Sequence, residues 1–196
     1  GEIDKLLGEL QDKDLIYEGH KVMPYCPRCT TVLSNFETNQ GYKDTQDPAI
    51  TVRFKIVGEE NTYAMAWTTT PWTLPSNLAL AVNPALEYVK VRVLESGEVV
   101  YLEPGRLAHY QERGQVGETE ELERLSGAQL VGRPYAPLLP YFEHEREDEQ
   151  GKRVAFMVVG ADYVGTDAGT GIVHQAPAFG EDDFRHDGTR TELELS

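Results

Sequence analysis

Short segments in which apolar and polar residues alternate dominate the middle of the chain. In residues 50–56 every second residue is apolar, and a period of two is the spacing of side chains on one face of a β-strand. Further segments that alternate in this way, or that are apolar throughout, are 63–67, 78–82, 89–93, 99–102 and 154–159. Short strands separated by turns indicate a barrel or a sandwich.

Helical patterns are few. Residues 2–13 place Ile3 and three leucines at helical spacing, which predicts an amphipathic helix that needs a partner surface. Residues 104–113 begin with a proline suited to a first helical turn, and residues 118–125 are rich in acids near their start. We expect both to be helices that cover edges or ends of the strands.

Two remaining segments carry no regular pattern. Residues 15–25 are predicted to be extended. Residues 143–152 are almost all charged, with one glycine, which predicts a solvated hairpin or loop. We assign no chemistry to that segment.

The bulk composition restricts the class of protein. A chain of 196 residues can form one compact domain, and its sequence has no apolar run near the ~18 to 20 residues that a membrane span needs. The first residues have neither a basic region nor an apolar stretch, so we expect a fragment of a cytoplasmic protein without a signal peptide. The net charge of -15 argues against simple electrostatic capture of nucleic acid.

The sequence has 2 cysteines, Cys26 and Cys29, separated by two residues. A pair with this spacing is half of a tetrahedral zinc site, and two cysteines cannot form the disulfide framework of a small secreted protein.

A run of hydroxyl residues, Thr68-Thr69-Thr70, ends one apolar segment and leads into Pro71. Proline cannot donate to a strand ladder, so the chain leaves the sheet there and the hydroxyls are expected at a rim. They could form a polar pocket wall. Threonine is also simply a good strand former, and the residues alone leave both interpretations open.

A second notable stretch is Gly169-Thr170-Gly171-Ile172-Val173-His174. Its glycines predict a tight turn into a strand that carries His174 at its far end. No Gly-Lys-Ser/Thr follows, so this is not a phosphate loop. Asp182 and Asp183 then stand where a loop enters a helix. Capping acids and a structural histidine explain this stretch as well as a functional site does.

Both stretches resemble one family. Residues 66–77, which contain Thr68-Thr69-Thr70-Pro71-Trp72, resemble the threonine-rich peptide of the editing insertion in isoleucyl-tRNA synthetases, and residues 169–183 resemble its second peptide. The leucine and valine relatives carry Thr-Thr-Arg-Pro at the first position, so Pro71-Trp72 favours the isoleucine enzymes. Residues 24–29 and 41–44 are also similar to that family, and the resemblance covers residues 15–184.

The resemblance implies a mainly β, closed barrel-like editing domain with a few short helices over residues 1–184. Residues 1–47 would supply a helix, an extended segment and half a zinc knuckle, and residues 48–184 the barrel core. Residues 185–196 are expected to be a tail that is disordered or foreign to the family. The implied partners are the rest of the synthetase, the 3′ end of aminoacylated tRNA(Ile), and valyl-adenosine or valyl-adenylate as a small ligand. We expect a monomer without membrane association.

The implied activity is hydrolysis of the ester in mischarged valyl-tRNA(Ile), by a positioned water, in a pocket that admits valine and excludes isoleucine. Asp183 would hold the substrate ammonium, Thr69 and Thr70 would hold the ester carbonyl or orient the water, and His174 would form the pocket wall. The resemblance places the other substrate contacts at Trp67, Thr68, Trp72, Thr73, Asn77 and Ala178.

Some family features are missing. The His-Ile-Gly-His and Lys-Met-Ser-Lys-Ser peptides that activate the amino acid do not occur, so we expect no aminoacylation by this chain. The second zinc-binding cysteine pair is also missing, so no metal and no cofactor are expected.

Two alternatives remain open. One is a metal-dependent hydrolase with His174, Asp182 and Asp183 as ligands. The other is a non-catalytic RNA-binding barrel.

Overall fold

A computed structural model describes residues 1–13, 15–16, 23–40, 43, 46 and 48–180. Its contacts divide the chain into two compact units, Gly1–Asp44 and Thr45–Ser196. Most of the segment predicted to be extended lies outside the described residues, as do Asp182, Asp183 and the predicted tail. That both units belong to one editing domain stays a prediction.

The first unit contains two helices and a small hairpin. Helix α1 (Glu2–Gln11) confirms the predicted amphipathic helix, and none of its residues is buried within the described part of the chain. Strands β1 (Tyr25–Cys26) and β2 (Thr31–Val32) pair antiparallel. Helix α2 (Asn35–Asn39) begins after Ser34, whose side chain accepts from the Glu37 amide while the Glu37 carboxylate accepts from the Ser34 amide. This reciprocal capping fixes the start of a short helix.

The second unit is mainly β, as predicted. Its strands are β3 (Ile50–Lys55), β4 (Thr62–Thr68), β5 (Ala79–Val82), β6 (Glu87–Val93), β7 (Val99–Leu102), β8 (Thr119–Ser126), β9 (Met157–Gly160) and β10 (Ile172–Gln175). Its helical elements are the 3₁₀ helices η1 (Pro71–Ser76) and η2 (Pro140–Arg146) and the α-helices α3 (Pro104–Glu112) and α4 (Gly127–Leu130). The proline-initiated helix predicted at 104–113 is therefore present as α3.

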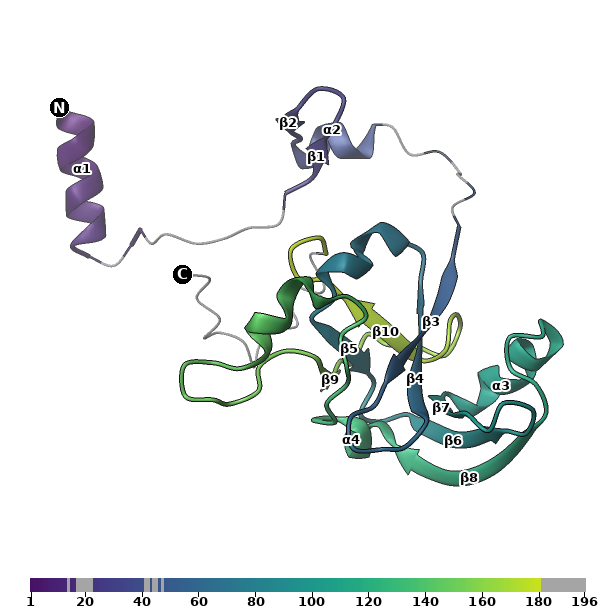
Figure 1. The fold of residues 1–196 in the computed structure, drawn as a ribbon. Helices are drawn as coiled ribbons and strands as arrows, with labels where there is room; N and C mark the ends of the chain where they lie inside the picture. The colour runs from purple at the N-terminus through teal and green to yellow at the C-terminus, as the bar shows by residue number, and fades with distance from the viewer. Residues whose placement is uncertain (14, 17–22, 41–42, 44–45, 47, 181–196) are drawn as a thin grey trace. The chain divides into compact units, whose positions relative to one another are not determined.

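Strand β4 organises the sheet (Figure 1). Along one edge it pairs antiparallel with β3. Along its other edge it pairs parallel with β7 at its start and with β10 at its end. The sheet thus extends in two arms from β4, one through β7 and β6 to β8 and one through β10 and β5 to β9.

The predicted closed barrel is wrong in one respect, because the sheet is open. The two arms end at β8 and β9, which do not pair with each other among the described residues. The chain leaves β8 directly into α4, whose start is capped by a bond from the Ser126 amide to Gln129 Oε1 at 2.9 Å. Helix α4 contacts both end strands, so it stands where a closing ladder would otherwise form. The result is an open, curled sheet, a half-barrel (Figure 1).

One cluster of the core is built around aromatic side chains. Tyr135 stands at its centre, with ring centroids 5.3 Å from Phe54 and 6.1 Å from Phe156, both edge to face. All three side chains are buried. Edge-to-face packing of this kind adds to the hydrophobic contribution of burial. A second cluster forms where β6 and β7 pack against Tyr110 of α3.

The helix predicted at 118–125 is wrong. These residues form β8, which pairs antiparallel with β6 over its whole length. Ion pairs join the two strands, from Arg92 to Glu120 at 3.0 Å and from Arg124 to Glu87 at 2.8 Å. An available strand edge with complementary charges therefore prevails over the weak local preference of acidic residues for a helix.

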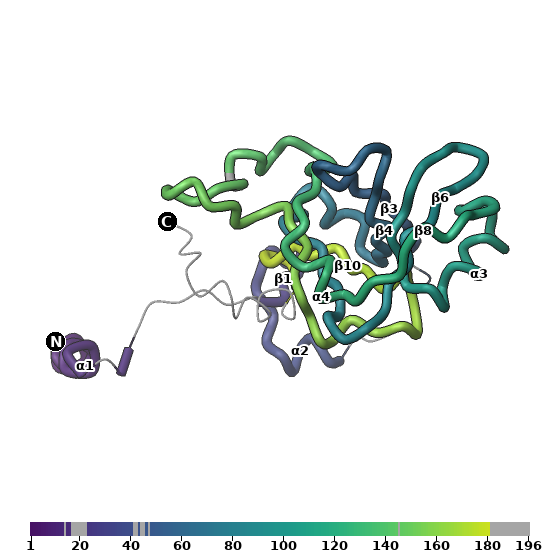
Figure 2. The backbone as a smooth tube through the Cα atoms, turned by 90° about the horizontal axis from the view of Figure 1, so that it is seen from below, coloured from purple at the N-terminus to yellow at the C-terminus, as the bar shows by residue number. Residues whose placement is uncertain are grey.

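The charged segment 143–152 is partly helical and partly the predicted hairpin. It begins within η2, and an antiparallel bridge between Glu147 and Arg153 then closes a turn. The tip of this hairpin extends away from the strands (Figure 2). Among the described residues, no helix has the length and apolar character that a membrane span requires.

Candidate functional site

The threonine run lies where β4 ends and η1 begins. Thr68 is the last residue of β4 and is buried, whereas Thr69 and Thr70 are exposed. Pro71 opens η1, and the Thr73 amide donates to the Thr70 carbonyl at 3.0 Å. The expectation that proline ends the strand and leaves the hydroxyls at a rim is therefore confirmed.

The threonine hydroxyls form a connected group. The Thr70 amide donates to Thr68 Oγ1 at 3.1 Å, and Thr70 Oγ1 lies 3.3 Å from the Oγ1 atoms of both Thr68 and Thr73. The Thr73 hydroxyl donates to the Thr70 carbonyl at 2.7 Å. This group holds the backbone at the strand end in one conformation.

Two glycines allow the second stretch to approach β4. Gly171 has a φ of +76°, and a Cβ there would lie 2.6 Å from the Glu103 Cβ. Gly169 has a φ of +70°, and a Cβ there would lie 2.9 Å from the Trp67 ring. Both positions require glycine. Beyond this turn β10 pairs with β4 at Trp67 and with β5 along its length, which carries His174 to the threonines.

His174 bonds through both ring nitrogens. Nε2 lies 2.8 Å from Thr73 Oγ1, and Nδ1 lies 2.9 Å from Asn77 Nδ2. The single hydroxyl proton of Thr73 is already donated to a carbonyl, so Thr73 accepts from Nε2–H. An amide nitrogen only donates, so Nδ1 accepts from Asn77. The imidazole is therefore neutral, with its proton on Nε2.

The electrostatic environment favours the same state. His174 is 6% exposed, and this burial lowers its pKa to about 4, because a charged imidazolium loses hydration in the core. The ring is uncharged near neutral pH. Since Nε2 donates to Thr73, His174 does not act as a base toward that hydroxyl and does not activate Thr73 as a nucleophile.

Asn77 fixes the other side of the histidine. Besides its bond to His174, Asn77 Nδ2 donates to the Ala79 carbonyl at 2.9 Å, and Asn77 Oδ1 accepts from the Tyr135 hydroxyl at 2.6 Å. Asn77 is buried. Its amide is thus fully used in holding the imidazole against the aromatic core.

Tyr135 is the member of this cluster that the sequence did not predict. Its partner Asn77 is 58 residues away in the sequence, and no local motif surrounds it. A tyrosine within an apolar segment indicates only core packing, and the hydrogen bond to Asn77 depends on the tertiary fold.

The structure unites some of the predicted site residues and separates others. Thr68, Thr70, Thr73, Asn77 and His174 form one hydrogen-bonded cluster. Trp67 precedes Thr68 in β4, so its side chain lies on the opposite face of the sheet.

There Trp67 lines a cavity of about 270 Å³ together with the glycine turn. Thr69, Trp72 and Ala178 are exposed. Trp72 and Ala178 take no part in the hydrogen bonds of the cluster. Asp183 lies outside the described residues.

The cysteine pair lies at the tip of the β1–β2 hairpin. The Cys29 amide approaches Cys26 Sγ at 3.4 Å, and hydrogen bonds from this turn lower the pKa of the Cys26 thiol. This turn suits half of a zinc knuckle. The described residues contain no group of three potential metal ligands, so they do not complete the site.

Comparisons with known proteins show the family of this chain. Residues 2–176 match the family described as tRNA synthetases class I (I, L, M and V). The chain is 49% identical over 176 residues to an isoleucine–tRNA ligase of Bdellovibrio bacteriovorus, covering 90% of this chain and 16% of that protein. It is 50% identical over 177 residues to the cytoplasmic isoleucine–tRNA ligase of Mus musculus, covering 90% of this chain and 14% of that protein. The chain thus spans less than a fifth of the length of either relative.

Solved structures show a similar fold. The crystal structure of GlLeuRS-CP1 matches with a TM-score of 0.56 at 19% identity, over 70% of this chain and 58% of that one. The editing domain of the P. knowlesi cytosolic leucyl-tRNA synthetase matches with a TM-score of 0.52 at 14% identity, over 69% of this chain and 59% of that one.

The chain belongs to the class I tRNA synthetase family of the I, L, M and V group.

Proposed function

We propose that this chain is the proofreading part of an isoleucine–tRNA ligase, and that it hydrolyses the ester between valine and tRNA(Ile). The observation that carries this proposal is the buried, neutral His174, held between Thr73 and Asn77, with Thr70 Oγ1 3.3 Å from Thr73 Oγ1. The similarity to isoleucine–tRNA ligases supports the choice of amino acid.

Such a site is needed because valine and isoleucine differ by one methylene. That difference is generally worth only about 1 to 3 kcal/mol in an apolar pocket, and these two amino acids are the standard illustration of the limit. A second pocket that admits only the smaller side chain, and hydrolyses what it admits, supplies the missing discrimination.

His174 is suited to form the wall of this pocket. Two hydrogen bonds fix its ring, so the wall does not yield readily to an additional methyl group. Its lowered pKa keeps it uncharged, and a neutral ring does not repel the ammonium group of the aminoacyl substrate.

Thr69 and Thr70 are exposed residues at the end of β4, and we assign their hydroxyls to orient the ester carbonyl or the attacking water. Positioning alone can contribute much of the rate of a hydrolysis. We assign attack to water because the proton arrangement of the cluster leaves Thr73 unactivated. By resemblance, Asp183 holds the substrate ammonium through a charge-assisted hydrogen bond.

The hydrogen bonds of His174 also bear on a metal-dependent mechanism. A histidine that binds a metal ion must offer the lone pair of one ring nitrogen. In the structure Nδ1 accepts from Asn77 and Nε2 carries the proton given to Thr73. Ligation would require rupture of this buried network.

The test is release of valine from preformed valyl-tRNA(Ile), in the presence of excess chelator. We expect the unmodified chain to release valine and Asp183→Ala to be at least about a hundredfold slower, because the charge-assisted anchor is lost. Asp162→Ala is the matched control, since Asp162 is exposed. Equal rates in the two variants, or activity abolished by the chelator, would contradict the proposal.

A further inference from the structure

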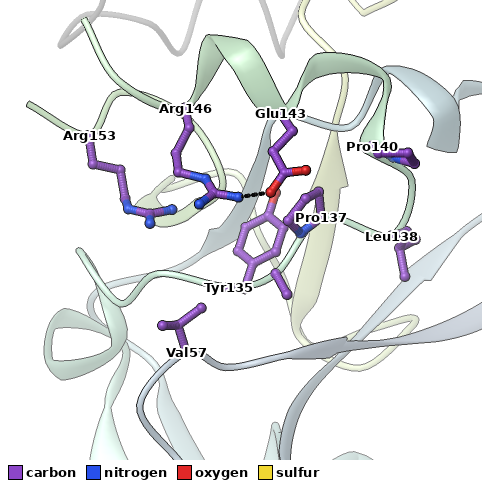
Figure 3. A pocket seen from close by; sticks show the side chains of 9 residues that line it. Val57, Tyr135, Pro137, Leu138, Pro140, Glu143, Arg146 and Arg153 are labelled. Atoms are coloured by element: carbon purple, nitrogen blue, oxygen red, sulfur yellow. Dashed lines mark hydrogen bonds and ion pairs between the residues drawn. The ribbon is translucent and has the colours of Figure 1, made fainter. Parts of the chain in front are cut away.

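A second cavity lies beside the candidate site. It has a volume of about 310 Å³ and is lined by Val57, Tyr135, Ala136, Pro137, Leu138, Pro140, Glu143, Arg146 and Arg153. Figure 3 shows Arg146 and Arg153 side by side at one end, with Tyr135 at the floor. Neither His174 nor the threonine run lines it.

Each of the two arginines that line this cavity has one hydrogen-bond donor without a partner in the described part of the chain. Arg146 Nε and Arg153 Nη1 are buried and lack a hydrogen-bond partner among the described residues. An N–H group removed from water without a partner costs about 1 to 3 kcal/mol. Two such groups on neighbouring guanidinium side chains indicate a place for an acceptor supplied from outside.

The charge balance of the lining favours an anion. Glu143 forms an ion pair with Arg146, and it is the single carboxylate among the lining residues, which also hold two guanidinium groups. The lining therefore carries one net positive charge, in a chain whose net charge is -15. Guanidinium groups match the geometry of phosphate oxygens, to which they donate in pairs.

The remaining walls are apolar and flat. Tyr135, Pro137 and Leu138 lie opposite the arginines (Figure 3). Tyr135 is buried, so Pro137 and Leu138 supply the accessible apolar surface. Such a surface suits a ribose or one face of an unstacked base, and the guanidinium planes beside it can also pack on a base. A cavity with both features fits a nucleotide better than an isolated inorganic ion.

The cavity is structurally connected to the candidate site. Tyr135 forms its floor and donates its hydroxyl to Asn77, which in turn holds His174. Helix η2, which carries Arg146, also contacts η1, which carries Thr73. A chain of nucleotides that ends at the threonine–histidine cluster can therefore pass this cavity.

We propose that the cavity with Arg146 and Arg153 is a subsite for a phosphodiester and its nucleoside in the single-stranded 3′ end of an RNA. This inference rests on the proposed function, which brings the terminal adenosine of a tRNA to His174. The arginines hold the backbone upstream of that adenosine and set its direction.

The test measures the affinity of the 196-residue chain for a labelled four-nucleotide RNA ending in adenosine, at low ionic strength, by fluorescence anisotropy. The variants are Arg146→Gln and Arg153→Gln, with Arg153→Lys to retain the charge. Arg92→Gln is the matched control, because it removes the same charge from an exposed pair on β6. Circular dichroism establishes that each variant is folded.

We expect each glutamine variant to bind about tenfold more weakly, as for a lost charge-assisted hydrogen bond. The slope of log affinity against log salt should fall by about 0.7 for each phosphate contact removed from a single strand. Arg153→Lys should bind with intermediate affinity and Arg92→Gln within twofold of the unmodified chain. An RNA with neutral methylphosphonate linkages should bind weakly, and equally to all variants.

Equal RNA affinity in the unmodified chain and the glutamine variants would overturn the proposal, as would a lack of RNA binding by the unmodified chain. Binding of inorganic phosphate that depends on both arginines, without any such dependence for RNA, would indicate a free-anion site instead. None of these measurements requires turnover. A failure of the subsite is therefore distinguishable from a failure of valine release, which tests the proposed function.

Discussion

The hydrogen bond from Tyr135 to Asn77 offers the sharpest test of how the site is held. Tyr135→Phe removes the hydroxyl that donates to Asn77 Oδ1 at 2.6 Å and retains the ring. The contacts with Phe54 and Phe156, at centroid distances of 5.3 and 6.1 Å, therefore remain.

The magnitude follows from the burial of both partners. Tyr135 is 0% exposed and Asn77 is 4% exposed, so water does not readily replace the lost donor. A buried acceptor without a partner costs about 1 to 3 kcal/mol of unfolding free energy. For a unit of this size each kcal/mol lowers the thermal midpoint by about 2 to 4 °C.

The assay is urea denaturation followed by tryptophan fluorescence and circular dichroism. The matched control is Tyr141→Phe, whose side chain is 63% exposed. We expect a loss below about 0.5 kcal/mol there, because water replaces the hydroxyl. Equal losses in the two variants, or a Tyr135→Phe chain as stable as the unmodified one, would refute the reasoning.

Further outcomes follow from the same cluster and its glycine turn. His174→Ala should begin to release isoleucine from isoleucyl-tRNA(Ile), measured as the ratio of isoleucine to valine release, and an unchanged ratio would remove the role of His174 as a wall. Burial lowers the pKa of folded His174 to about 4, so below about pH 6.5 the unfolded chain binds a proton there more readily than the folded chain. The free energy of unfolding of the unmodified chain should therefore fall by about 2 kcal/mol from pH 7 to pH 5. His174→Gln should lack that loss, and urea titrations at the two pH values measure it. Gly171→Ala should destabilise by about 2 kcal/mol or more, because its Cβ would lie 2.6 Å from Glu103. Gly97 also has a positive φ, but a Cβ there would meet open space. Gly97→Ala should therefore lower the free energy of unfolding by only about 1 kcal/mol in the same titration.

Local patterns predicted much of the fold because most strands are buried on at least one face. Residues 50–55 alternate and form β3, and the apolar residues 99–102 form β7. Strand β8 was missed because its residues are mostly exposed acids, and its conformation is set by pairing with β6. Closure of the barrel depends on whether the two end strands, β8 and β9, pair with each other. The local sequence pattern does not indicate such long-range pairing.

The candidate site shows the same division. The exposed threonines beside Pro71 follow from the chemistry of proline in a strand. The contact of Thr73 with His174 spans 101 residues, and only a family resemblance indicated that the two stretches belong to one site. Tyr135 carries no local signal at all. The charged segment 143–152 is predicted to have no chemistry. The unpartnered donors of Arg146 and Arg153 depend on the tertiary structure around them and leave no local signal.

The central claim is that this chain distinguishes two amino acids that differ by one methylene. The most direct measurement is the rate of amino acid release by the unmodified chain from valyl-tRNA(Ile) and isoleucyl-tRNA(Ile), prepared in parallel and corrected for spontaneous hydrolysis. We predict release of valine at least about tenfold faster than release of isoleucine, since a firm wall excludes the additional methyl group. Equal release of both amino acids, or release of neither, would contradict the account.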